Sequence, residues 1–294
     1  MTKLSLLLFI FLSHSTFSQK VQVRPYPMEE NAILWKITGE NVKDDCYLFG
    51  TMHLIEKAYF KFPKKLKKIV KKSETLIMEI AGMPNQTEAM GYIMLREGSF
   101  FDFFSPEQTD TILKWANEKF GMEEAAFRAG FSKMKPFAVM QLATQIYFSG
   151  KTESFEMTLD YLAKENKMEV KGLETVAQQM AFFDDLTDEQ QAELLMQTIR
   201  DGDKEIETIK EMEEVYTQQN IDALYKLITD SEGVIKDEQQ TFLDQRNSNW
   251  VPQIMEQIAK KPTFIAVGAG HLGGPNGVIR LLEKQGYTLT PVKL

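Results

Sequence analysis

Short apolar runs and longer amphipathic stretches alternate along the chain, and this pattern predicts a mixed α/β fold. Two of the apolar runs, Ile33 to Ile37 and Cys46 to Phe49, lie near the start and are separated by the polar segment Gly39 to Asp45. Each run has the length and composition of a strand, and the polar segment between them is typical of a turn. We therefore expect these two strands to form a β-hairpin.

A strand, a helix and a strand follow one another near each end of the chain. In the first unit, the strand Cys46 to Phe49 precedes a helix over Pro63 to Ser73 and a strand over Thr75 to Ile80. Strands joined through a helix run in the same direction, so we expect these two to pair in parallel. The second unit has a strand over Thr263 to Val267, a helix over Val278 to Lys284 and a strand over Tyr287 to Val292.

The middle of the chain is predicted to be mainly helical. Ser105 and Thr187 are each followed three residues later by a glutamine, which is a signature of a helix start. Further helices are expected over residues 136 to 148, 154 to 166, 175 to 183, 206 to 216, 219 to 229 and 235 to 258, with a short strand at Glu169 to Gly172. We predict one α/β domain over residues 19–294. Its central mixed, mainly parallel sheet is formed by the N- and C-terminal βαβ units, with a large helical insertion at about 84–258.

Composition limits the class of protein. The chain has 294 residues, of which 43% are hydrophobic and 26% charged, and these proportions are typical of a folded globular protein. The formal net charge of −8 disfavours non-specific binding to nucleic acid, so nucleic acid is not an expected partner. Cys46 is the only cysteine, which excludes an intrachain disulfide, and we expect it to be a core residue.

The first 18 residues have the features of a secretory signal peptide. Lys3 is followed by the apolar run Leu4 to Leu12 and by the small polar stretch Ser13 to Ser18. The apolar run is about ten residues long, whereas a transmembrane helix needs about twenty. We therefore expect an exported protein, periplasmic or secreted, without a transmembrane segment; its oligomeric state does not follow from the sequence.

Both histidines outside this leader close a G-x-x-H motif. Gly50 to His53 follows the strand Cys46 to Phe49, and Gly268 to His271 follows the strand Thr263 to Val267. Ligands bind at the carboxyl ends of the strands in open α/β sheets, so the two imidazoles could meet there. The alternative is that each histidine only holds a turn, but the repetition of the motif favours a shared site.

Two histidines hold a metal ion weakly, and a carboxylate would complete the site. Glu79 ends the strand that we expect beside the strand carrying His53, so it is the first candidate. Glu174, after the strand Glu169 to Gly172, and Glu156, at a helix start, are secondary candidates. Arg246 lies on the helix that leads to the second motif, where position alone indicates a surface residue.

The sequence does not support a dinucleotide-binding site or another common catalytic motif. Gly268 to Gly273 matches the dinucleotide pattern G-x-G-x-x-G, but the acidic residue expected about twenty positions later is missing from Thr288 to Leu294. We interpret these glycines as positions where the backbone approaches a site closely. The sequence contains no H-E-x-x-H, G-x-S-x-G or P-loop motif.

The motifs together resemble the TraB/GumN family, which includes the animal Tiki proteases. The resemblance runs in order from about residue 33 to 292 and rests on Leu48-Phe49-Gly50-Thr51-Met52-His53, Gly172-Leu173-Glu174-Thr175, Arg246-Asn247, Val267-Gly268-Ala269-Gly270-His271-Leu272-Gly273-Gly274 and Gly286-Tyr287. The family is similar in outline to erythromycin esterase and to haem-binding ChaN-like proteins. Tiki proteins are membrane-anchored, whereas this sequence shows no anchor.

The resemblance implies functional roles for four residues. His53, His271 and Glu79 would hold a divalent ion such as zinc, manganese or cobalt, and Arg246 would stabilise the oxyanion of a hydrolytic reaction, with peptides as the substrate class. Two alternatives remain open. One is a metal-independent hydrolase of small esters in which a histidine is the base and a glutamate orients it. The other is a non-catalytic envelope protein that binds haem or a metal.

Overall fold

The computed structural model describes residues 28, 30–42, 44–82, 86–146, 148, 151–229 and 236–294. The predicted signal peptide over residues 1–18 lies outside this part of the chain. Among the described residues, no helix combines the length and the apolar character required to cross a bilayer.

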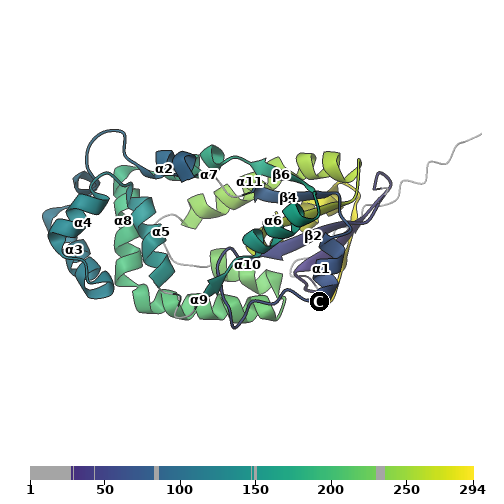
Figure 1. The fold of residues 1–294 in the computed structure, drawn as a ribbon, viewed down its shortest axis with the longest axis horizontal. Coiled ribbons are helices and arrows are strands. Elements are labelled where there is room, and N and C mark those ends of the chain that lie inside the picture. The colour runs from purple at the N-terminus through teal and green to yellow at the C-terminus, as the bar shows by residue number, and fades with distance from the viewer. Residues whose placement is uncertain are drawn as a thin grey trace, which may run out of the picture.

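Within the described residues, six strands form the main sheet in the order β6-β4-β7-β2-β1-β8 (Figure 1). Their bounds are Leu34–Thr38 (β1), Cys46–Thr51 (β2), Thr75–Ile80 (β4), Glu169–Glu174 (β6), Thr263–Gly268 (β7) and Thr288–Pro291 (β8). The strands β6, β4, β7 and β2 run in parallel, and β1 is antiparallel to its neighbours β2 and β8. The mixed, mainly parallel sheet and its N-terminal hairpin are therefore confirmed. A separate small ribbon pairs β3 (Ile55–Glu56) with β5 (Thr152–Glu153).

The prediction that consecutive strands of each βαβ unit pair directly was wrong. β2 and β4 run in the same direction, but β7 lies between them and pairs with both. Likewise, β8 pairs with β1 at the far edge and not with β7. In the first unit one strand from the other end of the chain lies between the two consecutive strands, and in the second unit two such strands do. This arrangement ties the two ends of the sequence into one sheet.

Helices pack around the sheet and extend away from it. Those nearest the sheet are α1 (Lys64–Val70), α6 (Phe155–Glu165), α10 (Ile221–Thr229), α11 (Lys236–Ile258) and α12 (Val278–Lys284). The short helix η2 (Ala269–His271) directly follows β7 and contacts β2. The others are α2 (Gln86–Ile93), η1 (Phe100–Phe103), α3 (Pro106–Phe120), α4 (Glu124–Phe131), α5 (Pro136–Ile146), α7 (Val176–Asp184), α8 (Asp188–Arg200) and α9 (Gly202–Thr217). The expected capping residues Ser105 and Thr187 begin α3 and α8, each in a complete capping box.

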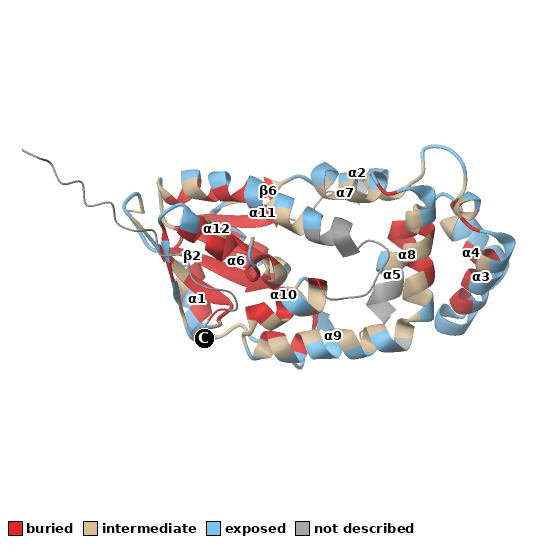
Figure 2. Cartoon of the chain, turned by 180° about the vertical axis from the view of Figure 1, so that it is seen from behind, coloured by how far each residue is buried: buried red, intermediate tan, exposed pale blue. Residues whose placement is uncertain are grey.

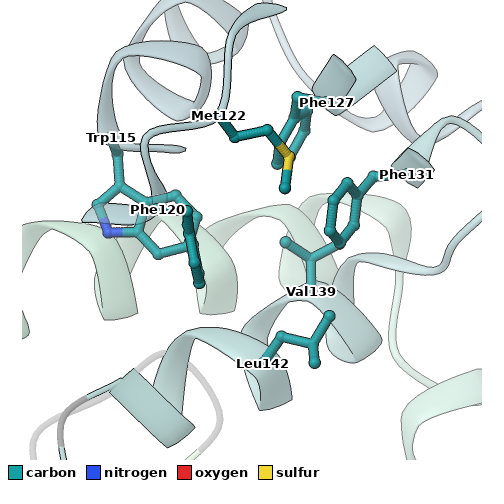
Figure 3. Close-up of a pocket in the computed structure, with 7 residues that line it drawn as sticks. All are labelled: Trp115, Phe120, Met122, Phe127, Phe131, Val139 and Leu142. Atoms are coloured by element: carbon teal, nitrogen blue, oxygen red, sulfur yellow. The ribbon is translucent and has the colours of Figure 1, made fainter. Parts of the chain in front are cut away.

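The molecule has two buried regions (Figure 2). The larger one contains the sheet with its flanking helices, and Cys46 is fully buried there, as predicted. The smaller one lies at the opposite end, among η1, α3, α4, α5 and α8. It encloses a hollow of about 350 Å³ lined by the apolar side chains Trp115, Phe120, Met122, Phe127, Phe131, Val139 and Leu142 (Figure 3).

The two faces of the sheet receive different helices. Thr75 on β4 accepts a hydrogen bond from Gln257 of α11, whereas Phe49 on β2 packs edge-on against Phe155 of α6. Since successive side chains of a strand point to opposite faces, Glu79 shares the face of Thr75 and points toward α11. This alternation determines which helix supplies the partners of Glu79.

The glycine-rich loop after β7 packs closely against α10. A Cβ atom at Gly273 would lie 2.6 Å from the carbonyl oxygen of Ile221, and one at Gly270 would lie 2.4 Å from the Ile228 side chain. The backbone contact at Gly273 requires a residue without a side chain, whereas the end of the Ile228 side chain could move away from Gly270. We had interpreted these glycines as positions where the backbone approaches a site, but at Gly273 the close approach is to the helix α10.

We predict that Gly273→Ala lowers the free energy of unfolding by about 1–3 kcal/mol, because its new methyl group would collide with the backbone of Ile221. The matched control is Gly130→Ala in α4, where an added Cβ meets no atom within 4 Å. The control should be neutral or stabilising by up to about 1 kcal/mol, since alanine favours a helix over glycine. Urea unfolding measures both variants, and equal effects would contradict the close packing of this loop.

Candidate functional site

The carboxyl ends of the three central strands bring the candidate residues together. His53 follows β2, His271 follows β7, and Glu79 lies near the end of β4 on the other side of β7. Residues at equivalent depth pair across β2 and β7, with Thr51 opposite Gly268. The expected meeting of the two G-x-x-H motifs at this edge is thus observed. The strand beside Glu79 is β7, however, and not the strand of His53 as we had expected.

One carboxylate oxygen of Glu79 faces both imidazoles. Its Oε1 atom lies 3.9 Å from Nε2 of His53 and 3.9 Å from Nε2 of His271. A Cβ atom at Gly268 would enter this same space, 3.2 Å from Glu79 Oε1 and 3.8 Å from His53 Nε2. The absence of a side chain at Gly268 therefore keeps the space between the three groups open.

The site has a buried floor and an exposed mouth. The side chains of Glu79 and His271 are only 7% and 6% exposed, whereas that of His53 is 63% exposed. Burial alone would raise the pKa of Glu79. The charge of His271, which is present only at the low pH where this imidazole is protonated, the charges of His53 and Arg246 and the hydrogen bond from the Gly268 N–H outweigh burial and lower this pKa to about 2.

Two neighbours determine the tautomer of His271. Arg246 Nη1 lies 3.1 Å from Nε2 of His271, and because arginine can only donate, this nitrogen accepts. The other nitrogen, Nδ1, then carries the hydrogen and donates it to Oδ1 of Asn247 at 2.7 Å. Burial lowers the pKa of His271 to about 3, despite the opposing charge of Glu79. His271 is therefore neutral at ordinary pH.

His53 is held by a carboxylate at the start of α6. Its Nδ1 lies 2.9 Å from Glu156 Oε1, which also accepts a 2.6 Å hydrogen bond from the hydroxyl of Thr51. Ser154, the N-cap of α6, donates to Oε2 of the same carboxylate. Desolvation disfavours the imidazolium, but the hydrogen bond and charge of Glu156 and the charge of Glu79 raise the pKa of His53 to about 9. At pH 7, His53 is therefore mainly protonated and positively charged, whereas His271 is neutral.

Arg246 joins three elements through a buried network of charges. Its Nη2 atom donates to Glu79 Oε2 at 2.6 Å and to Glu174, and its Nε lies 3.1 Å from Glu174 Oε1. Trp250 Nε1 also donates to Glu174, at 3.2 Å. The guanidinium is 12% exposed and lies over the rings of Phe242 and Trp250, 4.9 and 4.7 Å from their centres. Arg246 is thus not the surface residue that its position suggested.

The donor atoms around Gly268 are of the kinds that bind divalent ions, but they lie farther apart than in a closed metal site. Two imidazoles, each with its Nδ1 hydrogen-bonded to a second residue, and one carboxylate are typical ligands of zinc and similar ions. Closed tetrahedral sites bring such donor atoms to about 3.3 Å from one another, closer than the 3.9 Å found here. Among the described residues, no cluster of three His, Cys, Asp or Glu meets the full geometry. A metal ion would also compete with Arg246 for Nε2 of His271.

All six candidates from the sequence lie in this one site. The secondary candidates Glu174 and Glu156 are direct partners of Arg246 and His53. Sequence reasoning missed several supporting residues, which are Thr51, Ser154, Gln179, Asn247 and Trp250. Asn247 and Trp250 had a usable signal, because they follow Arg246 on the same helix. The roles of the six candidates in catalysis or metal binding remain predictions.

Comparison with known proteins identified one family. The profile of the TraB/PrgY/gumN family matches residues 33–291, which is most of the chain. No curated protein and no solved structure gave a match. The matched region extends from β1 to the end of β8 and includes all candidate residues of the site.

We predict that Glu156→Gln lowers the pKa of His53 from about 9 toward the usual value of 6.5 in the metal-free protein, because the neutral amide removes the stabilising charge. At pH 7.5, His53 should then be mainly neutral in the variant and charged in the parent protein. NMR titration of the imidazole resonances measures this change, with assignment by His53→Ala. Glu153→Gln, three residues earlier, is the matched control and should leave the titration in place. An unchanged titration in Glu156→Gln would contradict the contact.

Proposed function

The chain belongs to the TraB/PrgY/gumN family, and on that premise we propose that it is a metal-dependent hydrolase that acts on peptides. The observation that carries the proposal is the convergence of His53, His271 and Glu79 on the space above Gly268. Peptides are proposed as substrates because the sequence motifs resemble those of the Tiki proteases. Small esters are the second substrate class to be tested.

His53, His271 and Glu79 are the residues that would hold the ion, and zinc, manganese and cobalt all suit this donor set. Such an ion would lower the pKa of a water molecule and polarise the carbonyl group of a substrate. In this proposal, neighbouring residues orient the two imidazole rings before an ion binds. Asn247 holds the ring of His271 in the tautomer whose Nε2 carries the electron pair, which an ion would take over from Arg246. Glu156 would hold His53 in the same tautomer once the ion displaces the proton from its Nε2.

Arg246 is proposed to stabilise negative charge that develops on the substrate. Its Nη1 atom contacts His271 at the floor of the site, while Nε and Nη2 are held by Glu174 and Glu79. The guanidinium is therefore fixed in position before the substrate arrives. A positive charge that is fixed in a largely buried site stabilises an oxyanion more effectively than a positive charge exposed to solvent does.

A metal-independent hydrolase is the second candidate, favoured by the contact between His53 and Glu156. Here His53 would take a proton from water at the exposed mouth, and Glu156 would orient its ring. Since the pKa of His53 is about 9, its basic form would predominate only above this pH. This candidate therefore requires activity that rises up to about pH 9 and survives a chelator.

We predict that the protein hydrolyses peptides only when loaded with a divalent ion, and that His53→Ala and His271→Ala each lower the rate at least 100-fold. The measurement combines metal content by mass spectrometry with cleavage of a peptide mixture after chelation and after addition of zinc, manganese or cobalt. The untagged protein is used so that all metal is bound by the chain itself. Glu153→Ala, at the neighbouring ribbon, is the control and should retain full activity.

Each alternative function gives a different result in the same experiment. Hydrolysis that resists chelation but is lost in His53→Ala would contradict the metal mechanism and support the histidine base. Binding of haem, seen as a Soret band, without turnover of any peptide or ester would contradict both hydrolases.

A further inference from the structure

A groove of about 800 Å³ is lined by residues of α7, α11 and the end of β6 and shares part of its lining with the site. Figure 1 shows where these elements lie in the fold. The groove begins at Glu174, Arg246 and Trp250, which are shared with the site, and extends past Phe242 to Phe182. Its volume lies in the range typical of pockets that hold a small ligand or a few residues of a peptide.

Neutral side chains dominate the lining of this groove. Glu174 and Arg246 are paired with each other, and among the described residues that line the groove the only other charged side chain is that of Asp185. Gln245 and Asn249, one turn apart on α11, are exposed, and their side-chain amides form no hydrogen bond with another described residue. Amide side chains both donate and accept, as do the main-chain groups of a peptide.

An aromatic pair forms the apolar part of the groove and links it to the site. Phe182 of α7 stacks on Phe242 of α11, with ring centres 4.3 Å apart and an angle of 24° between the rings. On its other side, Phe242 lies beneath the guanidinium of Arg246. Both rings are only partly buried, so they retain apolar surface for a ligand.

We propose that this groove binds the part of a peptide substrate next to the bond that is cleaved, with an apolar or aromatic side chain against Phe182 and Phe242. The peptide main chain would form hydrogen bonds with the amides of Gln245 and Asn249. This inference rests on the proposed hydrolase function and specifies which substrates the enzyme selects. The class is an uncharged peptide segment with a large apolar residue.

The lining favours a peptide over an oligosaccharide. Sugar rings bind flat against an open aromatic face, whereas Phe182 and Phe242 stack on each other and cover one face of each. Carboxylates would be strong acceptors for sugar hydroxyl groups, but Glu174 is already bonded to Arg246, Gln179 and Trp250. An apolar side chain with a neutral main chain fits the remaining surface better.

Cleavage of a peptide library tests the groove directly. The metal-loaded parent protein should cleave peptides with phenylalanine or leucine at one fixed position at least tenfold faster than peptides with glycine there. Phe182→Ala, which removes one ring of the stacked pair, should reduce this preference to less than threefold by slowing cleavage of phenylalanine and leucine peptides. Unchanged preference in this variant would overturn the proposal.

Two further variants separate groove effects from general damage. Ala181→Trp places a large side chain on the exposed helix surface that lines the groove, so it should weaken cleavage of phenylalanine peptides even if Phe182→Ala fails to fold. Phe131→Ala is the matched control, because Phe131 also stacks on a phenylalanine, Phe127, but in the distant hollow of the helical end (Figure 3). A loss of preference in Phe131→Ala as large as in Phe182→Ala would overturn the assignment.

Binding to the metal-free protein distinguishes failure of the groove from failure of the hydrolase function. The probes are the blocked pentapeptide acetyl-Ala-Ala-Phe-Ala-Ala-amide and its glycine analogue, followed by saturation-transfer NMR. Binding of the phenylalanine probe that is lost in Ala181→Trp would support the groove even if no cleavage occurs. Equal binding of both probes, absence of binding, or displacement of the probe by chitotriose from the same groove would overturn it.

Discussion

The buried ion pairs of Arg246 hold the candidate site together. One guanidinium from α11 bonds to Glu79 of β4, to Glu174 at the end of β6 and to His271 after β7. Three segments that are far apart in sequence are thereby fixed relative to one another. Buried charges of this kind stabilise a fold only as a complete set, since removal of one partner typically costs about 3–5 kcal/mol. The network therefore links the stability of this region to the geometry of the site.

The order of strands makes this arrangement possible. β7 enters between β2 and β4, so that His271 and Gly268 lie between His53 on one side and Glu79 on the other. On the face of the sheet covered by α6, Glu156 bonds to His53. On the face covered by α11, Arg246 bonds to Glu79. The site thus combines groups from both faces at one edge of the sheet. The groove between α7 and α11 begins at the same arginine.

Local patterns predicted most of the elements and the residues that meet. Apolar runs located the strands, capping sequences located the starts of α3 and α8, and the repeated motif brought His53 and His271 to one edge. Strand order was not predictable in the same way. A βαβ unit determines that its two strands run in the same direction, but it does not determine whether another strand lies between them. The environment of Arg246 was also hidden, since its burial depends on β4 and β6, more than 70 residues away.

The central claim is that His53, His271 and Glu79 share one functional space above Gly268, and Gly268→Ala tests it most directly. The backbone at this position, with φ −51° and ψ 134°, accepts an alanine, while the new methyl group would lie 3.2 Å from Glu79 Oε1. We predict a folded variant with a melting temperature within a few degrees of the parent, but with at least tenfold weaker zinc binding, measured by calorimetric titration. Zinc binding equal to that of the parent would contradict the claim.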